Sequence, residues 1–169
     1  MKSPPPKSPA TKANPLPPLD APVRPRILIA DDNAQGVELL EAYLSGIECD
    51  IDTAADGEET LRKIKQWQPD LVLLDIMMPK ISGFEVCKRL RADPATQETA
   101  VLMITALDQQ SDIDRAVEAG TDDFLTKPIN KTELLLRVRS LLESQQHQRE
   151  LDGALAYIEA VERGASRGG

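Results

Sequence analysis

The stretch LVLLDIMMPKISG, residues 71 to 83, joins an apolar run to an aspartate, Asp75, and a proline-containing turn. Four consecutive apolar residues, Leu71 to Leu74, are typical of a strand buried on both faces of a parallel sheet. The carboxylate at the end of this strand has two explanations. Asp and Pro are ordinary at a strand-to-loop junction, and alternatively the strand aims Asp75 into a functional site. Taken alone, the stretch favours the first explanation.

The same alternation continues along the chain from Arg26. Strand-like runs occupy residues 26–30, 48–54, 70–74, 100–105 and 122–126. Five segments with apolar residues at helical spacing separate or follow them, and in the fourth we expect Ile113 and Val117 to face the core. Strands that alternate with helices predict an α/β fold, a doubly wound five-stranded parallel sheet flanked by five helices. The folded domain is predicted over residues 26–142.

The two ends of the chain have a different composition. Nine of the 13 prolines fall in residues 1–25, which predicts a disordered tail that acts as a spacer or as a polyproline ligand. The last predicted helix runs from Lys131 to about Arg163, so residues 143–169 form a helical extension with a flexible end. Its apolar residues allow either a short coiled coil or a frayed helix: Leu151, Leu155, Ile158 and Val161.

Composition limits the classes of function. The 169 residues carry a formal net charge of −8, which argues against a broad nucleic-acid surface. No apolar run is long enough to cross a bilayer, and the N-terminus lacks the apolar core of a secretory signal. We therefore expect a cytoplasmic protein without membrane contact. Cys49 and Cys87 have no metal-ligand spacing around them, which predicts small buried side chains.

Polar residues stand at the carboxyl ends of four predicted strands. Asp31 and Asp32 follow the first, Asp75 follows the third, Thr105 ends the fourth, and Lys127 follows the fifth. Each residue alone has a structural explanation, such as a helix cap or a turn. Ligands of a doubly wound sheet bind at this edge, so the occurrence of all of them there favours a shared site.

The chemistry of these residues predicts a magnesium ion and a phosphoryl group. Three crowded carboxylates repel each other and need a cation, and Mg²⁺ prefers oxygen ligands and is often shared with a phosphate. Zn²⁺ is disfavoured because the single histidine, His147, lies far out in the extension. Lys127 supplies charge and Thr105 a hydroxyl donor for a phosphoryl group. Asp75 is then predicted to be a nucleophile that becomes an aspartyl phosphate.

Four segments between residues 26 and 142 resemble the receiver domain of two-component response regulators: ILIADDN, LVLLDIMMPKISGFEVC, MITA and GTDDFLTKPINKTEL. The resemblance implies a phosphorylation switch and not an enzyme. It also implies the flavodoxin-like strand order 2-1-3-4-5. The expected partner is a sensor histidine kinase or a phosphotransfer protein, which donates the phosphoryl group.

The resemblance also implies the roles of the site residues. Asp75 matches the phosphoacceptor. Asp32 and Asp75 match the side-chain ligands of Mg²⁺, and Asp31 matches the acid that holds a metal-bound water. The backbone carbonyl of Met77 matches the third protein ligand of the ion.

The switch residues follow from the same resemblance. Thr105 and Lys127 match the pair that senses the phosphoryl group, and the peptide between Lys127 and Pro128 is expected to be cis. Phe124 stands where the family places its switch aromatic. Met77 and Leu107 occupy two variable positions that flank the phosphoryl group, and neither can position a water, which predicts slow loss of the phosphoryl group.

Three other functions share features with this sequence. A Mg²⁺-dependent phosphatase of the haloacid dehalogenase type also uses an aspartate after a strand, but it needs a second Asp where this chain has Met77. A flavodoxin-like binding module needs a Ser/Thr/Gly-rich phosphate loop where ADDNAQG places two acids. A receiver fragment of a longer protein, such as a diguanylate cyclase or a histidine kinase, stays open.

Mixed charges on the fourth helix, the fifth strand and the last helix suggest a homodimer. Isolated surface ion pairs contribute little, but a two-fold axis uses every pair twice. We expect this face, helped by the 143–163 helix, to form a dimer that phosphorylation strengthens. The charged residues are Asp114, Arg115, Glu118, Asp122, Asp123, Lys131, Arg137 and Arg139.

Overall fold

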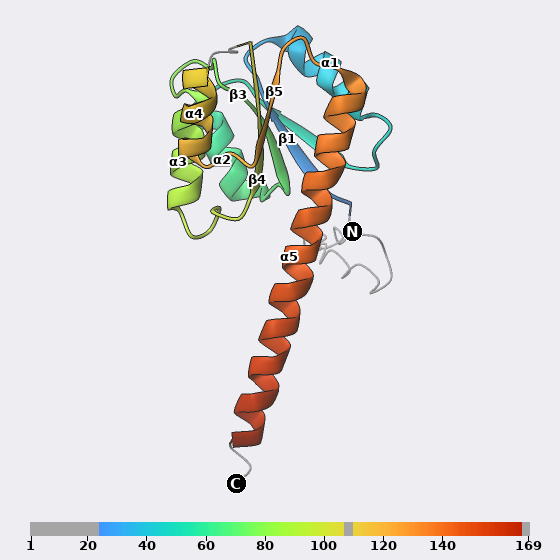
Figure 1. The fold of residues 1–169 in the computed structure, drawn as a ribbon, viewed down its shortest axis with the longest axis vertical. Helices are drawn as coiled ribbons and strands as arrows, with labels where there is room; N and C mark the ends of the chain where they lie inside the picture. The colour runs from blue at the N-terminus through green and yellow to red at the C-terminus, as the bar shows by residue number, and fades with distance from the viewer. Residues whose placement is uncertain (1–23, 107–109, 167–169) are drawn as a thin grey trace, which may run out of the picture.

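A computed structural model describes residues 24–106 and 110–166, with side chains to residue 164. Five strands form one sheet in the order β2-β1-β3-β4-β5, and every neighbouring pair is parallel (Figure 1). This order confirms the predicted doubly wound sheet. The strands are β1 (Arg26–Ala30), β2 (Asp50–Ala54), β3 (Leu71–Asp75), β4 (Ala100–Thr105) and β5 (Asp123–Thr126).

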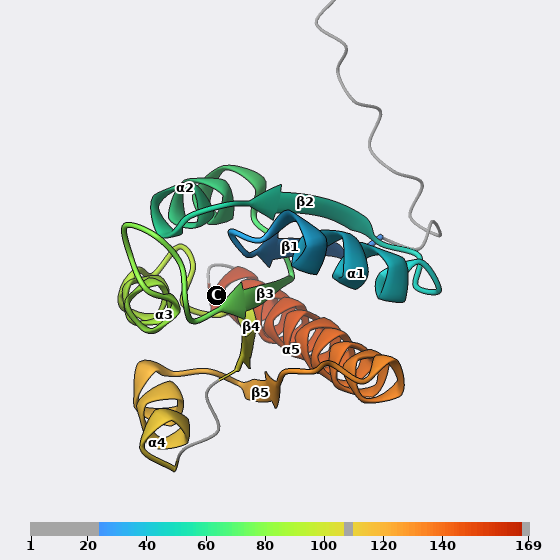
Figure 2. The same cartoon turned by 90° about the horizontal axis from the view of Figure 1, so that it is seen from above.

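Five helices connect and cover the strands, because each parallel strand needs a crossover to reach the next. Helices α1 and α5 lie on one face of the sheet, and α2, α3 and α4 lie on the other (Figure 2). The helices are α1 (Ala34–Leu44), α2 (Gly57–Trp67), α3 (Gly83–Ala92), α4 (Gln110–Ala119) and α5 (Lys131–Ser166). The predicted long last helix is therefore confirmed as one continuous element.

Strand β3 joins the two halves of the core. Its side chains alternate, so that Val72 and Leu74 pack under α2, α3 and α4, whereas Leu71 and Leu73 pack under α1 and α5. All five residues of β3 are buried. The prediction of a strand buried on both faces is confirmed, and its two-sided packing fixes the direction in which Asp75 leaves the sheet.

Helix α4 packs differently from the prediction. Ala116 and Ala119 are buried, whereas Val117 is 65% exposed and Ile113 is half-buried. The expectation that Val117 faces the core was wrong. Two alanines one turn apart let the helix lie close to its neighbours, and the guanidinium of Arg115 lies over the ring of Phe84 on α3, 4.2 Å from its centre.

Helix α5 is bound to the sheet again at the edge opposite the predicted site. Asp70, just before β3, is a buried carboxylate whose Oδ2 accepts a hydrogen bond from the backbone N–H of Arg26 at 2.6 Å. Its Oδ1 forms an ion pair with the guanidinium of Arg149 on α5. The side-chain amide of Gln145 donates to the backbone carbonyls of Asp70 and Glu98.

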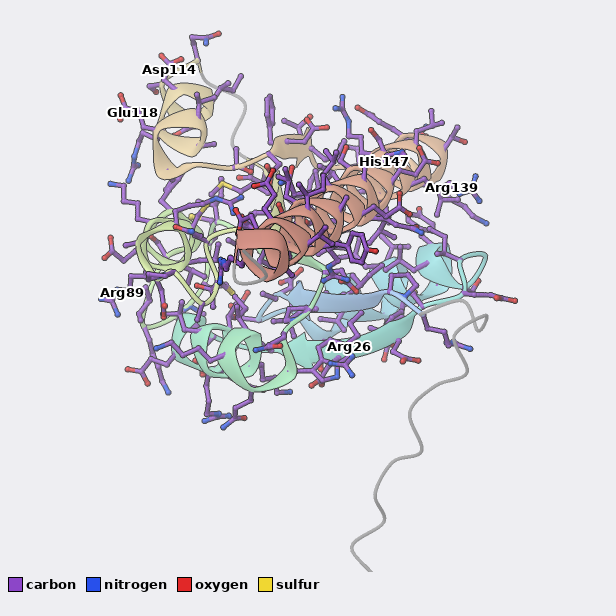
Figure 3. The ribbon with its side chains drawn as sticks, turned by 90° about the horizontal axis from the view of Figure 1, so that it is seen from below. Arg26, Arg89, Asp114, Glu118, Arg139 and His147 are labelled. Atoms are coloured by element: carbon purple, nitrogen blue, oxygen red, sulfur yellow. The ribbon has the colours of Figure 1, made fainter. Side chains whose placement is uncertain are left out.

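We call Asp70, Gln145 and Arg149 the α5 latch. Figure 3 shows this edge of the sheet from below, with Arg26 on β1 and His147 on α5. The latch fixes the direction in which α5 leaves the domain, because a buried carboxylate and two backbone carbonyls hold the helix more than three turns after it begins.

The two cysteines are free thiols. Cys87 is fully buried, and burial raises its pKa to about 11. Cys49 is half-buried. Within the residues that the structure describes, no helix has both the length and the apolar composition needed to cross a membrane.

Replacing Arg149 with Gln should loosen the α5 extension without unfolding the domain. The ion pair to Asp70 is lost, and because Arg149 is largely exposed we expect a modest effect of about 0.5–1 kcal/mol, or roughly two- to five-fold faster amide exchange. The measurement is hydrogen exchange by mass spectrometry on peptides covering residues 143–163. Arg139→Gln removes the same charge from an exposed position of the same helix and should leave this exchange unchanged. Identical exchange in all three proteins would contradict a role for the latch.

Candidate functional site

Three carboxylates meet where β1 and β3 end, at the point where the strand order reverses. The pairing of Ala30 with Leu74 places the next residues, Asp31 and Asp75, side by side. One oxygen from each of Asp31, Asp32 and Asp75 lies within 4.8 Å of the others. Asp31 and Asp75 are buried and Asp32 is exposed. The structure thus brings together the three acids that the sequence placed at one edge.

Two donors from different elements hold the Asp75 carboxylate. The backbone N–H of Met77 donates to its Oδ1 at 2.9 Å, and Lys127 Nζ donates to its Oδ2 at 2.9 Å. Asp75 is itself the last residue of β3, and the following N–H, from Ile76, donates to the carbonyl of Ile104 in β4. Both the backbone and the carboxylate plane of Asp75 are therefore fixed.

Lys127 reaches the acids from the turn between β5 and α5. Its backbone N–H donates to the carbonyl of Thr105 at 2.7 Å, and its peptide bond to Pro128 is cis, as expected. Its Nζ lies 3.9 Å from Asp31 Oδ2 as well. Burial works against the charge of Lys127, but the hydrogen bond to Asp75 and the attraction of the acids outweigh it, so the lysine pKa is raised.

The environment of Asp31 works against its negative charge. Burial raises the pKa of its carboxyl group; the N–H of Asn33, 2.9 Å away, works in the opposite direction, and the charge of Asp75 adds to the rise. Asn33 also caps helix α1, because its side chain accepts from the N–H groups of Gln35 and Gly36. The ionised form of Asp31 is thus less favoured than that of a free aspartate.

The remaining predicted residues are placed as follows. Thr105 is buried at the end of β4. Phe124 is half-buried in β5 and packs against the core under α2, α3 and α4. The side chain of Met77 is 65% exposed beside the site. Leu107 lies outside the described residues.

Two glycines that the sequence pattern did not single out lie in close contact with the acids. A Cβ atom on Gly83, the first residue of α3, would lie 2.5 Å from the carbonyl oxygen of Asp75 and 2.8 Å from the Cα of Ile76. A Cβ atom on Gly36 in α1 would lie 2.6 Å from Asp31 Oδ2. Glycine weakens a helix, so a glycine in the first turn of a predicted helix usually has a packing reason. This signal could have identified both positions from the sequence.

The donor set of this edge fits a magnesium ion. The three clustered acids offer carboxylate oxygens, which are the ligands that Mg²⁺ prefers. The raised pKa of Asp31 and the interaction of Lys127 with two of the acids are consistent with a cluster that favours a cation. The arrangement also presents a fixed carboxylate next to a lysine, which suits attack on a phosphoryl group.

The chain belongs to the response regulator receiver domain family, whose model matches residues 27–139. It is 44% identical over 133 residues to the response regulator PleD of Caulobacter vibrioides, covering 76% of this chain and 29% of PleD. It is 46% identical over 118 residues to a regulator of Synechocystis described as DNA-binding, RpaA, covering 70% of this chain and 49% of RpaA. The chain therefore spans less than half the length of these relatives.

Solved structures show the same fold. A putative response regulator from Chloroflexus aurantiacus superposes with a TM-score of 0.69 at 37% identity, covering 72% of this chain and 99% of that one. The signal receiver domain of a putative LuxO repressor protein from Vibrio parahaemolyticus gives a TM-score of 0.72 at 26% identity, covering 76% and 98%. The resemblance noted in the sequence is thereby confirmed at the level of family and fold.

Gly83→Ala should destabilise the domain by about 1–3 kcal/mol, because the added methyl group would meet backbone atoms that cannot move aside cheaply. Urea unfolding followed by fluorescence or circular dichroism measures the change. Gly46→Ala is the matched control: its Cβ would meet nothing within 4 Å, so a change within about 0.5 kcal/mol is expected. The close approach to Asp75 is refuted if the two variants unfold at the same urea concentration.

Asp31→Asn should stabilise the metal-free protein. The substitution removes a buried charge beside Asp75, and the amide oxygen can still accept from Asn33. We expect a gain of about 1 kcal/mol, or about 2–4 °C in the melting temperature for a chain of this size, in EDTA at neutral pH. Asp50→Asn, at a half-exposed carboxylate at the other end of the sheet, serves as the control and should show no gain. A lower melting temperature for Asp31→Asn would contradict the repulsion described above.

Proposed function

We propose that this chain is a signalling switch that accepts a phosphoryl group on Asp75. One observation carries the proposal: Asp75 ends a fully buried central strand, and its two carboxylate oxygens are held by the Met77 N–H and Lys127 Nζ next to two further acids. A carboxylate oriented in this way is prepared for attack on phosphorus, since positioning removes much of the entropic barrier.

The proposed step begins with attack of an Asp75 oxygen on the phosphorus of a phosphorylated histidine of the donor. The new oxygen–phosphorus bond forms as the nitrogen–phosphorus bond breaks, and its electron pair stays on the imidazole, which takes up a proton from solvent. The product is an aspartyl phosphate. Lys127 Nζ, which now pairs with Asp75, and the Thr105 hydroxyl are proposed to bind the phosphoryl oxygens.

Asp32 and Asp75 are proposed to hold Mg²⁺ with the backbone carbonyl of Met77, while Asp31 holds a water of the ion. When bound, the ion neutralises charge on the transferring phosphoryl group. The protein's own contribution is to keep the acids together: the β1–β3 register places Asp31 beside Asp75, and Asn33 orients the Asp31 carboxylate.

The proposed donor is a sensor histidine kinase or a phosphotransfer protein, and the chain acts as a phosphoacceptor and not as an enzyme on other substrates. The phosphorylated state is proposed to signal through Thr105 and the half-buried Phe124, whose ring has no hydroxyl and therefore acts through packing. The cytoplasmic location and the absence of nucleic-acid binding stay predictions from the sequence.

We also propose a homodimer through α4, β5 and α5, as the charge pattern suggests. Part of that charge is used within the chain, because Arg137 binds Asp123 at 2.6 Å and Glu133 at 3.2 Å. Asp114 and Glu118 point outward from α4 (Figure 3), and Arg139 is exposed on α5. These three side chains are the part of the face best placed to meet a second copy.

Asp75→Asn should abolish phosphorylation by acetyl phosphate in the presence of Mg²⁺, because the amide is not a nucleophile for phosphorus. Intact-mass spectrometry should show one added phosphoryl group on the wild-type chain and none on the variant. Asp52→Asn changes a carboxylate of β2 outside the cluster and should be labelled like wild type. Equal labelling of Asp75→Asn and wild type would falsify the assignment.

A further inference from the structure

The far half of α5, beyond the residues that match the receiver family, carries an apolar stripe. Figure 1 shows this half of the helix projecting past the sheet, where no other described element lies against it. A row of exposed apolar side chains on a helix marks a contact surface for a partner. The stripe, as we define it, consists of Leu151 (60% exposed), Ala154, Leu155 (58%), Ile158 (51%) and Val161 (52%).

The α5 latch turns the stripe away from the chain's own domain. Arg149 contacts Asp70 and therefore marks the side of the helix that faces the domain. At about 100° per residue, the five stripe residues lie between about 120° and about 240° round the helix from Arg149, centred opposite to it. The receiver domain of the same chain therefore cannot cover the stripe while the latch is formed.

We propose that a second copy of this chain covers the stripe, with residues 150–163 of the two copies paired in parallel. Leu151, Ala154, Ile158 and Val161 are spaced three, four and three residues apart, which is the spacing of a coiled-coil seam. This surface is separate from the α4–β5–α5 face and lies outside the receiver match, so the inference does not depend on phosphorylation of Asp75.

The charges that flank the seam fit a parallel pair. In a parallel pair, residues that flank the seam on one copy lie opposite residues five positions further along the other copy. Glu150 is then opposite Leu155 of the second copy, and Tyr157 is opposite Glu162 of the second copy. No two like charges face each other, and the Tyr157 hydroxyl can donate to the Glu162 carboxylate. The acids of this segment therefore do not oppose pairing with an identical helix.

The receiver domain stabilises the helix that carries this short seam. An isolated helix of this length is marginal in water, because forming its first turn is costly. Here α5 is already formed by the burial of Leu134 and Val138 against the sheet, and the latch carries its direction past the sheet edge. The second copy thus meets a preformed helix and the pairing does not bear the cost of ordering it.

Disulfide trapping tests the arrangement on the full chain. In a Cys49→Ala background, which leaves the buried Cys87, the pair of variants is Ala154→Cys and Ala156→Cys. Two cysteines at the same position can bond only if their Cβ atoms approach to about 3.5–4.5 Å, as they do at a seam position of a parallel, in-register pair. Ala154 lies on the seam, and Ala156 lies about 200° further round the helix, on the Arg149 side.

We expect Ala154→Cys to form the cross-linked dimer at least five-fold faster than Ala156→Cys under mild oxidation, read on a non-reducing gel. Adding Ile158→Glu to the Ala154→Cys protein should return cross-linking to the Ala156→Cys rate, with helix content checked by circular dichroism. Equal rates for the two cysteine positions, or cross-linking that survives Ile158→Glu with the helix intact, overturns the proposal. Neither of these two outcomes bears on the proposed function, because labelling of Asp75 by acetyl phosphate is measured separately.

Discussion

The arrangement of the functional edge depends on the crowding of three carboxylates around Lys127. Asp31, Asp32 and Asp75 have oxygens within 4.8 Å of one another, and Lys127 Nζ lies 2.9 Å from Asp75 and 3.9 Å from Asp31. Like charges at this distance are unfavourable. The pKa of Asp31 is raised mainly by burial, and the charge of Asp75 adds to the rise. The parallel strands place all three acids at one edge of the sheet. A cation bound there would offset the electrostatic repulsion among them.

A second pattern links that edge to the rest of the molecule. Strand β3 has a carboxylate at or next to each end, Asp75 at the site and Asp70 at the opposite edge, and both are paired with cations from α5 or from the turn that leads into it. Lys127 stands just before the helix, and Arg149 lies well along it. Helix α5 is thus held against β3 at two points. A change of partner at Lys127 acts on a helix that is anchored again at Arg149, and the segment beyond this anchor presents the apolar stripe.

The sequence was sufficient for the sheet and the meeting of the acids, because apolar runs mark buried parallel strands and topology brings their carboxyl ends together. The strand order came from the resemblance to receiver domains and not from the apolar pattern. The sequence did not predict packing that depends on small side chains. The buried residues of α4 are alanines and not Val117, and Gly83 lets α3 approach the backbone of Asp75 closely. It could not predict the α5 latch either. Asp70 and Arg149 are far apart in the chain, and neither stands in a pattern that indicates a contact.

We propose that Asp75, and neither neighbouring acid, carries the phosphoryl group. The most direct measurement is to phosphorylate the chain with acetyl phosphate and Mg²⁺, reduce the acyl phosphate with borohydride, and sequence the peptides by tandem mass spectrometry. Reduction converts the phosphorylated aspartate to homoserine and so marks the acceptor. We expect homoserine at position 75. Homoserine at position 31 or 32, with position 75 unchanged, would contradict it.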